Sequence, residues 1–288
     1  EDYVRHVAQA FLQVGADDPR HNSAHKIDFR LQRTLKAWKS TDPAPDRVKP
    51  VPITVIRRIA TLAQTTQASD AVFCATADMI IIAFFFLLRP GEYTDNPNNP
   101  FRFADVQLFI GDTRINLNTA PIEQIQQARF ASLTFTNQKN GVRGKVIGLA
   151  RSGDPYLCPV LSIIRRVLYL RRHSAPSNTP LARVFGGTST VTAAAITTCI
   201  RDAVTHLGPQ LGFLPSDISA RCLRAAGATA LLLANVDPDV IRLIGRWRSD
   251  EMLRYLHVQA YPLMKHYAQK MLSAGMYTLI PNHLVPQR

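Results

Sequence analysis

The apolar run at residues 71–88 (AVFCATADMIIIAFFFLL) constrains the fold of this chain more than any other segment. It is long enough to raise the question of a membrane span, because about 20 apolar residues cross a bilayer. However, it contains Asp78, ends at Arg89 and belongs to a chain with a formal net charge of +13. We therefore expect a helix over 70–88 that is buried in a protein core, and no association with a membrane.

The rest of the chain has mostly helical periodicity, with several short strand-like runs. The expected helices cover 3–14, 23–38, 53–65, 159–173, 190–207, 219–235 and 237–245, with one more from 249 that stops before Pro262. The expected strands cover 103–110, 115–117, 129–136 and 143–149, and the residues NQKNG at 137–141 are typical of a turn. The predicted fold class is mainly α with a small antiparallel β-sheet.

Residues 41–52 (TDPAPDRVKPVP) contain four prolines and are expected to form a stiff linker. The linker separates two predicted domains. Residues 1–40 form the end of one helical domain, and residues 53–288 form a larger second domain.

The charge points to a polyanionic partner. The chain has 34 Lys and Arg residues against 21 Asp and Glu residues, and its pI is about 10. Nucleic acid is the commonest partner of so basic a domain, although a solvated basic surface is the simpler alternative. The four cysteines form no CxxC pair, and the sequence contains no HExxH, P-loop or Rossmann glycine motif. We therefore expect reduced thiols in an intracellular protein, with no metal site and no cofactor.

Four segments carry residues suited to phosphoryl transfer. The segment LLRPGE at 87–92 places Arg89 three residues before Glu92, and SARCLRAAGATALLLAN at 219–235 carries Arg221 and Arg224. The segment DVIRLIGRWRSDEMLRY at 239–255 carries Arg246, Trp247 and Tyr255, and the expected turn carries Lys139. A tyrosine can attack phosphorus and stay attached, arginines can bind two phosphate oxygens at once, and a lysine can protonate a leaving oxygen.

In this order and spacing, the four segments resemble the tyrosine recombinase, or phage integrase, family over roughly residue 53 to the end. Ten positions separate Gly245 from Tyr255, which is the usual interval in that family. The LLRPGE and GRW forms resemble integrases of eukaryotic mobile elements. The resemblance implies a catalytic domain preceded by the end of a helical core-binding domain.

The resemblance also implies a role for each site residue. Arg89 and Arg224 would clamp the scissile phosphate, and Tyr255 would be the nucleophile. Lys139 would protonate the 5′ oxygen, and Glu92 would brace the arginine helix rather than touch DNA. The remaining members of the expected site are Arg221 and Arg246, which stand where the family usually has histidines, and Trp247 beside them.

The implied function is that of a site-specific DNA recombinase or integrase that works through a 3′-phosphotyrosyl intermediate, without metal or ATP. Its expected partners are double-stranded DNA and further copies of itself in a tetrameric synapse. It would act inside the cell, in the nucleus if the element is eukaryotic and otherwise in the cytoplasm. Leu263, Tyr267 and Met271 recur at helical spacing after the nucleophile, so this segment either docks on a neighbouring subunit or packs on its own domain.

Three alternatives remain open at this stage. Because an arginine does not deprotonate at neutral pH, Arg221 cannot act as a base, and a degenerate relative that binds DNA without cutting it is one alternative. The second is strand relaxation like that of a type IB topoisomerase, and the third is a structural helical adaptor with a basic surface. Taken singly, Arg89 could be a helix-end charge, Lys139 a solvated turn residue and Tyr255 one of eight ordinary tyrosines.

Overall fold

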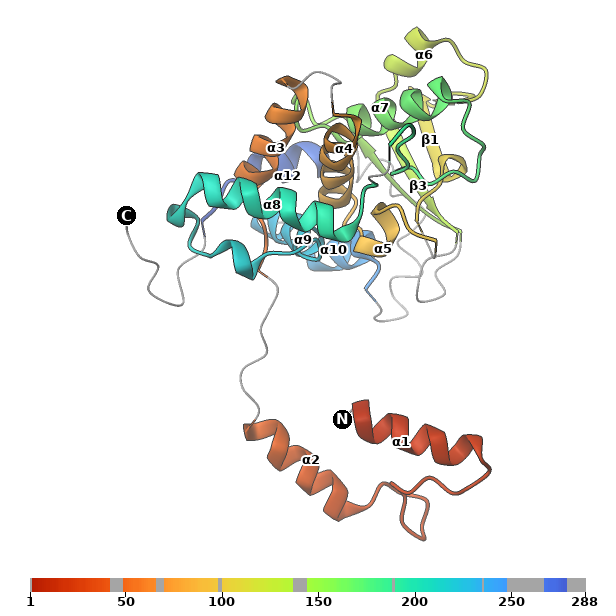
Figure 1. Ribbon diagram of the computed structural model, residues 1–288, viewed down its shortest axis with the longest axis vertical. Helices are drawn as coiled ribbons and strands as arrows, with labels where there is room; N and C mark the ends of the chain where they lie inside the picture. Colours follow the sequence, from red (N-terminus) through yellow and green to blue (C-terminus); the bar gives the residue numbers. More distant parts are fainter. Residues whose placement is uncertain are drawn as a thin grey trace. The chain divides into compact units, whose positions relative to one another are not determined.

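The computed structural model describes residues 2–41, 49–65, 70–97, 100–136, 144–187, 190–234, 236–247 and 267–278. It shows a mainly helical protein with one four-stranded antiparallel sheet, which confirms the predicted fold class (Figure 1). The chain forms two compact units, Glu1–Arg47 and Val48–Arg288. The division lies within the proline-rich segment, and the roles assigned to the two domains remain predictions.

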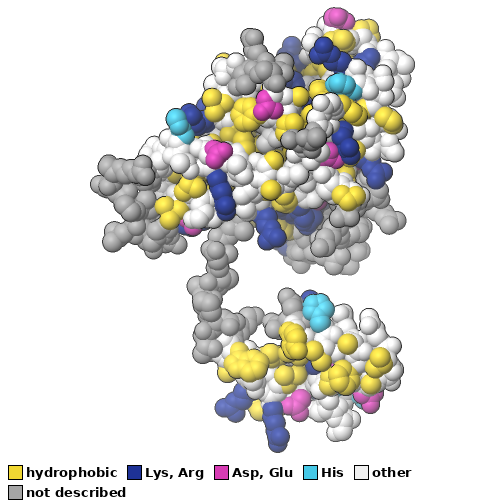
Figure 2. Space-filling model, in the orientation of Figure 1, with side chains coloured by type: hydrophobic (Ala, Val, Ile, Leu, Met, Phe, Trp, Pro, Cys, Tyr) yellow, Lys and Arg dark blue, Asp and Glu magenta, His cyan; other side chains and the backbone are white. Residues whose placement is uncertain are grey.

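The first unit contains α1 (Asp2–Gln13) and α2 (Phe29–Thr41). The helix expected from residue 23 begins only at Phe29, because the Asp28 carboxylate accepts hydrogen bonds from the backbone N–H groups of Arg30 and Leu31, at 2.8 and 3.3 Å. Large apolar side chains such as Trp38 are exposed on this unit, and Figure 2 shows hydrophobic side chains over its visible face.

Helix α4 (Ala71–Phe85) forms the centre of the second unit, as expected. It is buried from Ala75 onward, and its first turn is capped by the Asp70 carboxylate, which accepts from the N–H of Phe73 at 2.9 Å. The buried carboxylate of Asp78 accepts a hydrogen bond from Nε of Arg165 at 2.7 Å, which explains how an acid is tolerated here. Among the helices that the structure describes, none is long and apolar enough to cross a membrane.

The other helices of the second unit surround α4. Those in contact with it are α3 (Ile53–Thr65), α7 (Pro159–Arg172), α8 (Ala193–Leu207), α9 (Cys222–Leu233) and the short α5 (Pro90–Tyr93). Helix α8 begins three residues later than expected, because the Thr192 hydroxyl caps it by accepting from the N–H of Ala195 at 3.0 Å. Helix α9 is shorter than the expected 219–235 at both ends. The short 3-10 turns Pro209–Leu211 and Pro215–Asp217 lie between α8 and α9.

The sheet has the strand order β2-β1-β3-β4 and is antiparallel throughout. Its strands are β1 (Val106–Ile110), β2 (Thr113–Arg114), β3 (Phe130–Phe135) and β4 (Lys145–Ala150). Two expectations were wrong in detail. The first strand begins at Val106 because Phe103–Asp105 forms a 3-10 turn closed by the Asp105 carboxylate, and the second strand lies at 113–114 rather than 115–117. The short helix α6 (Ile122–Gln126) was not expected from the sequence.

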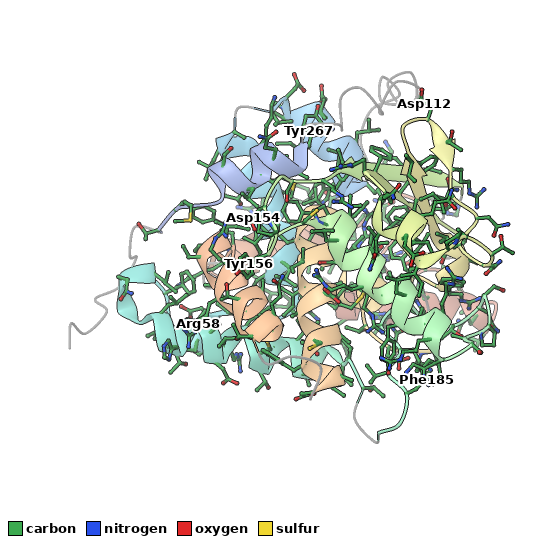
Figure 3. All side chains as sticks on the ribbon, turned by 90° about the horizontal axis from the view of Figure 1, so that it is seen from above. Arg58, Asp112, Asp154, Tyr156, Phe185 and Tyr267 are labelled. Atoms are coloured by element: carbon green, nitrogen blue, oxygen red, sulfur yellow. The ribbon has the colours of Figure 1, made fainter. Side chains whose placement is uncertain are left out.

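Two further helices complete the described part of the second unit. Helix α10 (Pro238–Gly245) begins as expected at the Asp237 cap, and α12 (Tyr267–Ala274) follows later in the chain. Tyr267 and Met271 on α12 are buried against their own unit, where α12 packs on α9. Figure 3 shows the position of Tyr267 in this unit. The backbone N–H of Ile53 also donates to the carbonyl of Gly275 at 2.8 Å. The described part of this segment therefore packs on its own domain, while Leu263 lies outside the described residues.

A buried arginine cluster as the candidate active site

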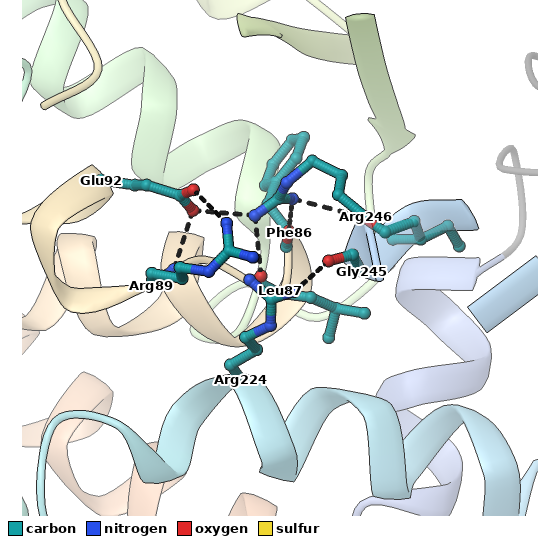
Figure 4. Close-up of polar contacts among 8 residues, drawn as sticks. Phe86, Leu87, Arg89, Glu92, Arg224, Gly245 and Arg246 are labelled. Carbon is teal, nitrogen blue, oxygen red and sulfur yellow. Dashed lines mark hydrogen bonds and ion pairs between the residues drawn. The ribbon is translucent and has the colours of Figure 1, made fainter. Parts of the chain in front are cut away.

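Glu92 is the acid around which the candidate site is built. Helix α4 ends at Phe85, three residues earlier than expected, and the chain turns at Leu87, whose φ is 52°. The single turn of α5 then begins at Pro90 and buries the Glu92 side chain. Its Oε2 accepts from the backbone N–H of Arg89 at 2.8 Å, and its Oε1 accepts from Arg89 Nη1 at 3.3 Å (Figure 4). Glu92 therefore holds the backbone and the side chain of Arg89 in place.

Arg246 is the second partner of Glu92. Its Nη2 donates to Glu92 Oε2 at 2.8 Å and to the carbonyl of Leu87 at 3.2 Å. Its Nη1 donates to the carbonyls of Phe86 and Ile244, each at 3.2 Å. This side chain is 2% exposed, so Arg246 acts as an internal link between the end of α4, α5 and the end of α10.

The backbone at the end of α10 directs Arg246 into the core. Arg246 has the left-handed conformation (φ 57°, ψ 38°), which is uncommon for a residue other than glycine. The preceding Gly245 has no side chain, and a Cβ atom there would lie 1.6 Å from the ring of Trp247. A glycine is therefore required for Trp247 to fold back over this helix end.

Arg224, on α9, contacts the backbone of Gly245. Its Nη2 donates to the Gly245 carbonyl, and its guanidinium carbon lies 4.5 Å from the centre of the Trp247 ring. Its Nη1 is buried and has no hydrogen-bond partner among the described residues. Burial, together with the nearby charges of Arg246 and Arg89, lowers the pKa of Arg224 to about 9, so it remains charged at neutral pH.

The cluster contains more positive than negative charge. In the part of the chain that the structure describes, Arg89 and Arg246 both pair with the carboxylate of Glu92, and the third guanidinium group, that of Arg224, lies near them without pairing with it. The side chain of Arg89 is 30% exposed, so the cluster is open to solvent at this residue. Such a site favours an anion with several acceptor oxygens, and a phosphate diester meets that requirement.

The structure brings together five of the eight residues that the sequence indicated: Arg89, Glu92, Arg224, Arg246 and Trp247. Arg221 precedes α9, and its side chain is exposed. Lys139 and Tyr255 lie outside the described residues.

Lys145 belongs to the same neighbourhood, although sequence reasoning did not select it. Its Nζ donates to the carbonyl of Leu243, near the end of α10, at 2.9 Å. Burial, and then the charge of Arg246, lowers the pKa of Lys145 to about 8. The expected turn directed attention to Lys139, whereas Lys145 opens the strand that follows that turn.

Other features of the described residues do not extend this site. No group of three His, Cys, Asp or Glu side chains among them could hold a metal ion. A cavity of about 450 Å³ is lined by Phe103, Val106 and Ile115, among others, and shares no residue with the cluster.

No protein-family model matches this chain, and no curated protein sequence matches it. Among solved structures, the chain is similar to the integrase from mycobacterium phage Brujita, with a TM-score of 0.40 and 16% sequence identity. The similarity covers 83% of this chain and 63% of the integrase chain, so this chain spans less than two thirds of that integrase.

Proposed function

We propose that this protein is a tyrosine recombinase that cuts and rejoins DNA through a covalent bond between Tyr255 and a backbone phosphate. The observation that carries the proposal is that Arg89, paired with Glu92, and Arg224, from a distant segment, lie in one cluster with an excess of positive charge. An enzyme that transfers phosphoryl groups needs this surplus of fixed positive charge, because the five-coordinate transition state gains negative charge on its oxygens.

The proposed reaction assigns one task to each part of the cluster. Arg89 and Arg224 bind the non-bridging oxygens of the scissile phosphate, while Glu92 and Arg246 hold them in position. The phenol of Tyr255 loses its proton and attacks phosphorus, the bond from phosphorus to the 5′ oxygen breaks, and the 5′ oxygen takes up a proton. The phosphotyrosyl ester retains the bond energy, so a 5′ hydroxyl can rejoin the strand by the reverse steps.

The surroundings of Arg246 bear on how Tyr255 is activated. Arg246 stands where the family usually has a histidine, and its Nη groups are engaged by Glu92 and backbone carbonyls. It cannot serve as a base, because arginine does not lose its proton in proteins. In this proposal, the positive field of the cluster alone favours the ionised phenol of Tyr255.

The same observation favours a second candidate function, namely a relative that binds DNA without cutting it. If the positive field is not sufficient to ionise Tyr255, the cluster still provides a phosphate-binding site. Binding would then be strongly salt-dependent, as expected for contacts to DNA phosphates, but no strand would be broken.

Covalent trapping distinguishes the two functions. The protein is incubated with a pool of duplexes that carry a randomised central sequence and a nick near it, so that a cut strand diffuses away. After denaturation, we expect a protein–DNA adduct with the wild type and none with Tyr255→Phe. Tyr156→Phe is the matched control, because Tyr156 lies in the loop after β4 and is 37% exposed.

Each result of this experiment supports a different function. Tight, salt-sensitive binding without an adduct would favour the DNA-binding relative, and an equal adduct with Tyr255→Phe would exclude Tyr255 as nucleophile. If the adduct forms, supercoil relaxation without recombinant products would assign the protein to strand relaxation. Recombinant products would support recombination and the proposed tetrameric synapse on DNA.

A further inference from the structure

The side chain of Lys145 lies beside the arginine cluster on the sheet side. Lys145 is the first residue of β4 and pairs with Phe135 of β3. Directly opposed residues of an antiparallel pair place their side chains on the same face of the sheet. The guanidinium carbon of Arg246 lies 4.0 Å from the centre of the Phe135 ring, so Lys145 and Arg246 flank the same aromatic side chain.

The contacts of Lys145 fix its ammonium group near the end of α10. Its hydrogen bond to the Leu243 carbonyl directs Nζ towards the helix end that continues into Arg246 and Trp247. No carboxylate forms an ion pair with Lys145 in the described part of the chain. An amino group in this position is therefore held close to Arg246 of the cluster without being neutralised.

Burial and then the charges around Lys145 favour release of its proton. Arg246 acts on it from the end of α10, whereas β3 has no titratable side chain. On α10 itself, Asp239 and Arg242 pair with each other at 2.9 Å. The pKa of Lys145, lowered to about 8, is close to the working pH that suits a general acid.

Helices α7 and α12, which also pack against β4, add no carboxylate to this environment, and the charged side chains of α7 are all arginines. The titratable residues of α12 are Tyr267 and Lys270, and the Lys270 ammonium lies 5.8 Å from the centre of the Tyr267 ring.

We propose that Lys145, rather than Lys139, donates the proton to the departing 5′ oxygen. The inference rests on the proposed function. As the Tyr255 oxygen bonds to phosphorus, the electron pair of the breaking bond passes to the 5′ oxygen, which takes a proton from Lys145 Nζ. The lysine is left as a neutral amine, and it recovers the proton from the 5′ hydroxyl when the strand is rejoined.

A substrate that needs no proton donor tests this role. Two nicked pools are prepared, one with normal diesters and one with sulfur in place of the bridging 5′ oxygen. A thiolate is a good leaving group without protonation, because a thiol has a pKa near 8.5, far below that of an alcohol. With the oxygen substrate, Lys145→Met should form the adduct about 10²- to 10⁴-fold more slowly than the wild type. With the sulfur substrate, it should react at nearly the wild-type rate.

Lys270→Met is the matched control, because Lys270 is an exposed lysine on α12 of the same unit. This variant should match the wild type on both substrates. Lys139→Met is the rival variant. If sulfur restores the rate of Lys139→Met and not that of Lys145→Met, the inference is overturned.

A purely structural role for Lys145 would give a different result. Because Lys145 also binds the Leu243 carbonyl, its loss could disturb α10, and the rate would then fall equally with both substrates. That result would overturn proton donation by Lys145. If the wild type formed no adduct with either substrate, the proposed function itself would fail.

The pH dependence of adduct formation can be measured on the wild type alone, so this test does not require that a variant folds. A proton donor must be protonated to act, so the rate with the oxygen substrate should fall as the pH rises through about 8. The rate with the sulfur substrate should not show this fall. A fall shared by both substrates, or by neither, would contradict the inference.

Discussion

The guanidinium group of Arg246 donates a hydrogen bond to the carboxylate of Glu92, which lies 154 positions earlier in the sequence, with 2.8 Å between Nη2 and Oε2. Both side chains are almost fully buried, at 2% and 4% exposed. The pair joins α10 to the turn that carries Arg89. Arg246, which the sequence placed among the expected site residues, therefore has a structural role: it connects two segments of the candidate site.

Removal of Arg246 should destabilise the second unit. Arg246→Met leaves the Glu92 carboxylate buried with only Arg89 as partner, and breaking a buried ion pair costs about 3 to 5 kcal/mol. Urea unfolding followed by circular dichroism measures this loss. Arg242→Met is the control, because the pair of Arg242 with Asp239 is 36% and 38% exposed, and its loss should cost under about 1 kcal/mol. Equal losses in the two variants would argue against a framing role for Arg246.

Replacement of both partners should restore much of the stability lost with Arg246→Met. In the double variant Arg246→Met, Glu92→Leu, no uncompensated carboxylate remains buried, and such apolar replacements are often neutral. The free energy of unfolding of the double variant should therefore lie above that of Arg246→Met. A double variant less stable than either single variant would indicate that Arg89, which also binds Glu92, depends on the carboxylate for its position.

Arg224→Lys should remove most of the proposed cleavage while leaving DNA binding largely intact. The lysine keeps the positive charge but loses the planar fork and the Nη1 donor, which has no partner among the described residues. Loss of one donor to a transition state typically lowers the rate by about 10² to 10³. Single-turnover adduct formation measures the rate, and the salt dependence of binding checks that the charge still acts. An unchanged adduct rate would mean that Arg224 does not clamp the phosphate.

The ring of Trp247 should hold Arg224 in its productive position. The guanidinium carbon lies 4.5 Å from the centre of the ring, and a cation–π contact of this kind contributes about 0.5 to 2 kcal/mol. Trp247→Ala should therefore slow adduct formation by about 2- to 30-fold. Trp247→Phe keeps an aromatic face and should recover part of the rate. If the phenylalanine and alanine variants were equally slow, the ring face would not be what positions Arg224.

Local signals in the sequence were sufficient to predict much of the fold. The apolar run predicted α4, and the Asp237-Pro238 pair predicted the start of α10. Such features depend on neighbours within a few residues. The predicted start of α2 was wrong, because the apolar spacing of Ile27, Leu31 and Leu35 suggested that the helix begins earlier. In the structure, Ile27 instead forms a β-bridge with His21, and Asp28 caps the helix.

The sequence predicted which residues belong to the candidate site better than it predicted where their side chains point. The order of the motifs brought Arg89, Glu92 and Arg224 to attention, but the direction of the Arg246 side chain depends on the left-handed backbone after Gly245 and on packing over Phe135. The packing over Phe135 arises from contact between distant segments. Lys145 was missed for the same reason, since its proximity to the cluster follows from the register between β3 and β4.

The crossing of α4 and α9 should tolerate no side chain at Gly227. A Cβ atom there would lie 2.1 Å from the Phe84 carbonyl oxygen and 2.4 Å from Leu87 Cδ2. Gly227→Ala should therefore destabilise the second unit by about 1 to 3 kcal/mol, as overpacking does. Gly91→Ala is the control, because nothing lies within 4 Å of its Cβ position, and it should change stability by under about 0.5 kcal/mol. Thermal unfolding of both variants makes the comparison, and a stable Gly227→Ala protein would contradict this close crossing.

The stability of the wild type should rise with pH relative to that of Lys145→Met above about pH 8. The pKa of Lys145 is lowered to about 8 in the folded protein, whereas an unfolded lysine titrates near 10.4. Between these values the unfolded chain binds more protons than the folded one, so the free energy of unfolding increases with pH. Lys145→Met lacks this group, and the difference between the two proteins in urea midpoints at pH 7 and pH 9.5 isolates its contribution. A difference that did not change with pH would mean that the folded state does not lower the pKa of Lys145, which would also weaken its proposed part in proton transfer.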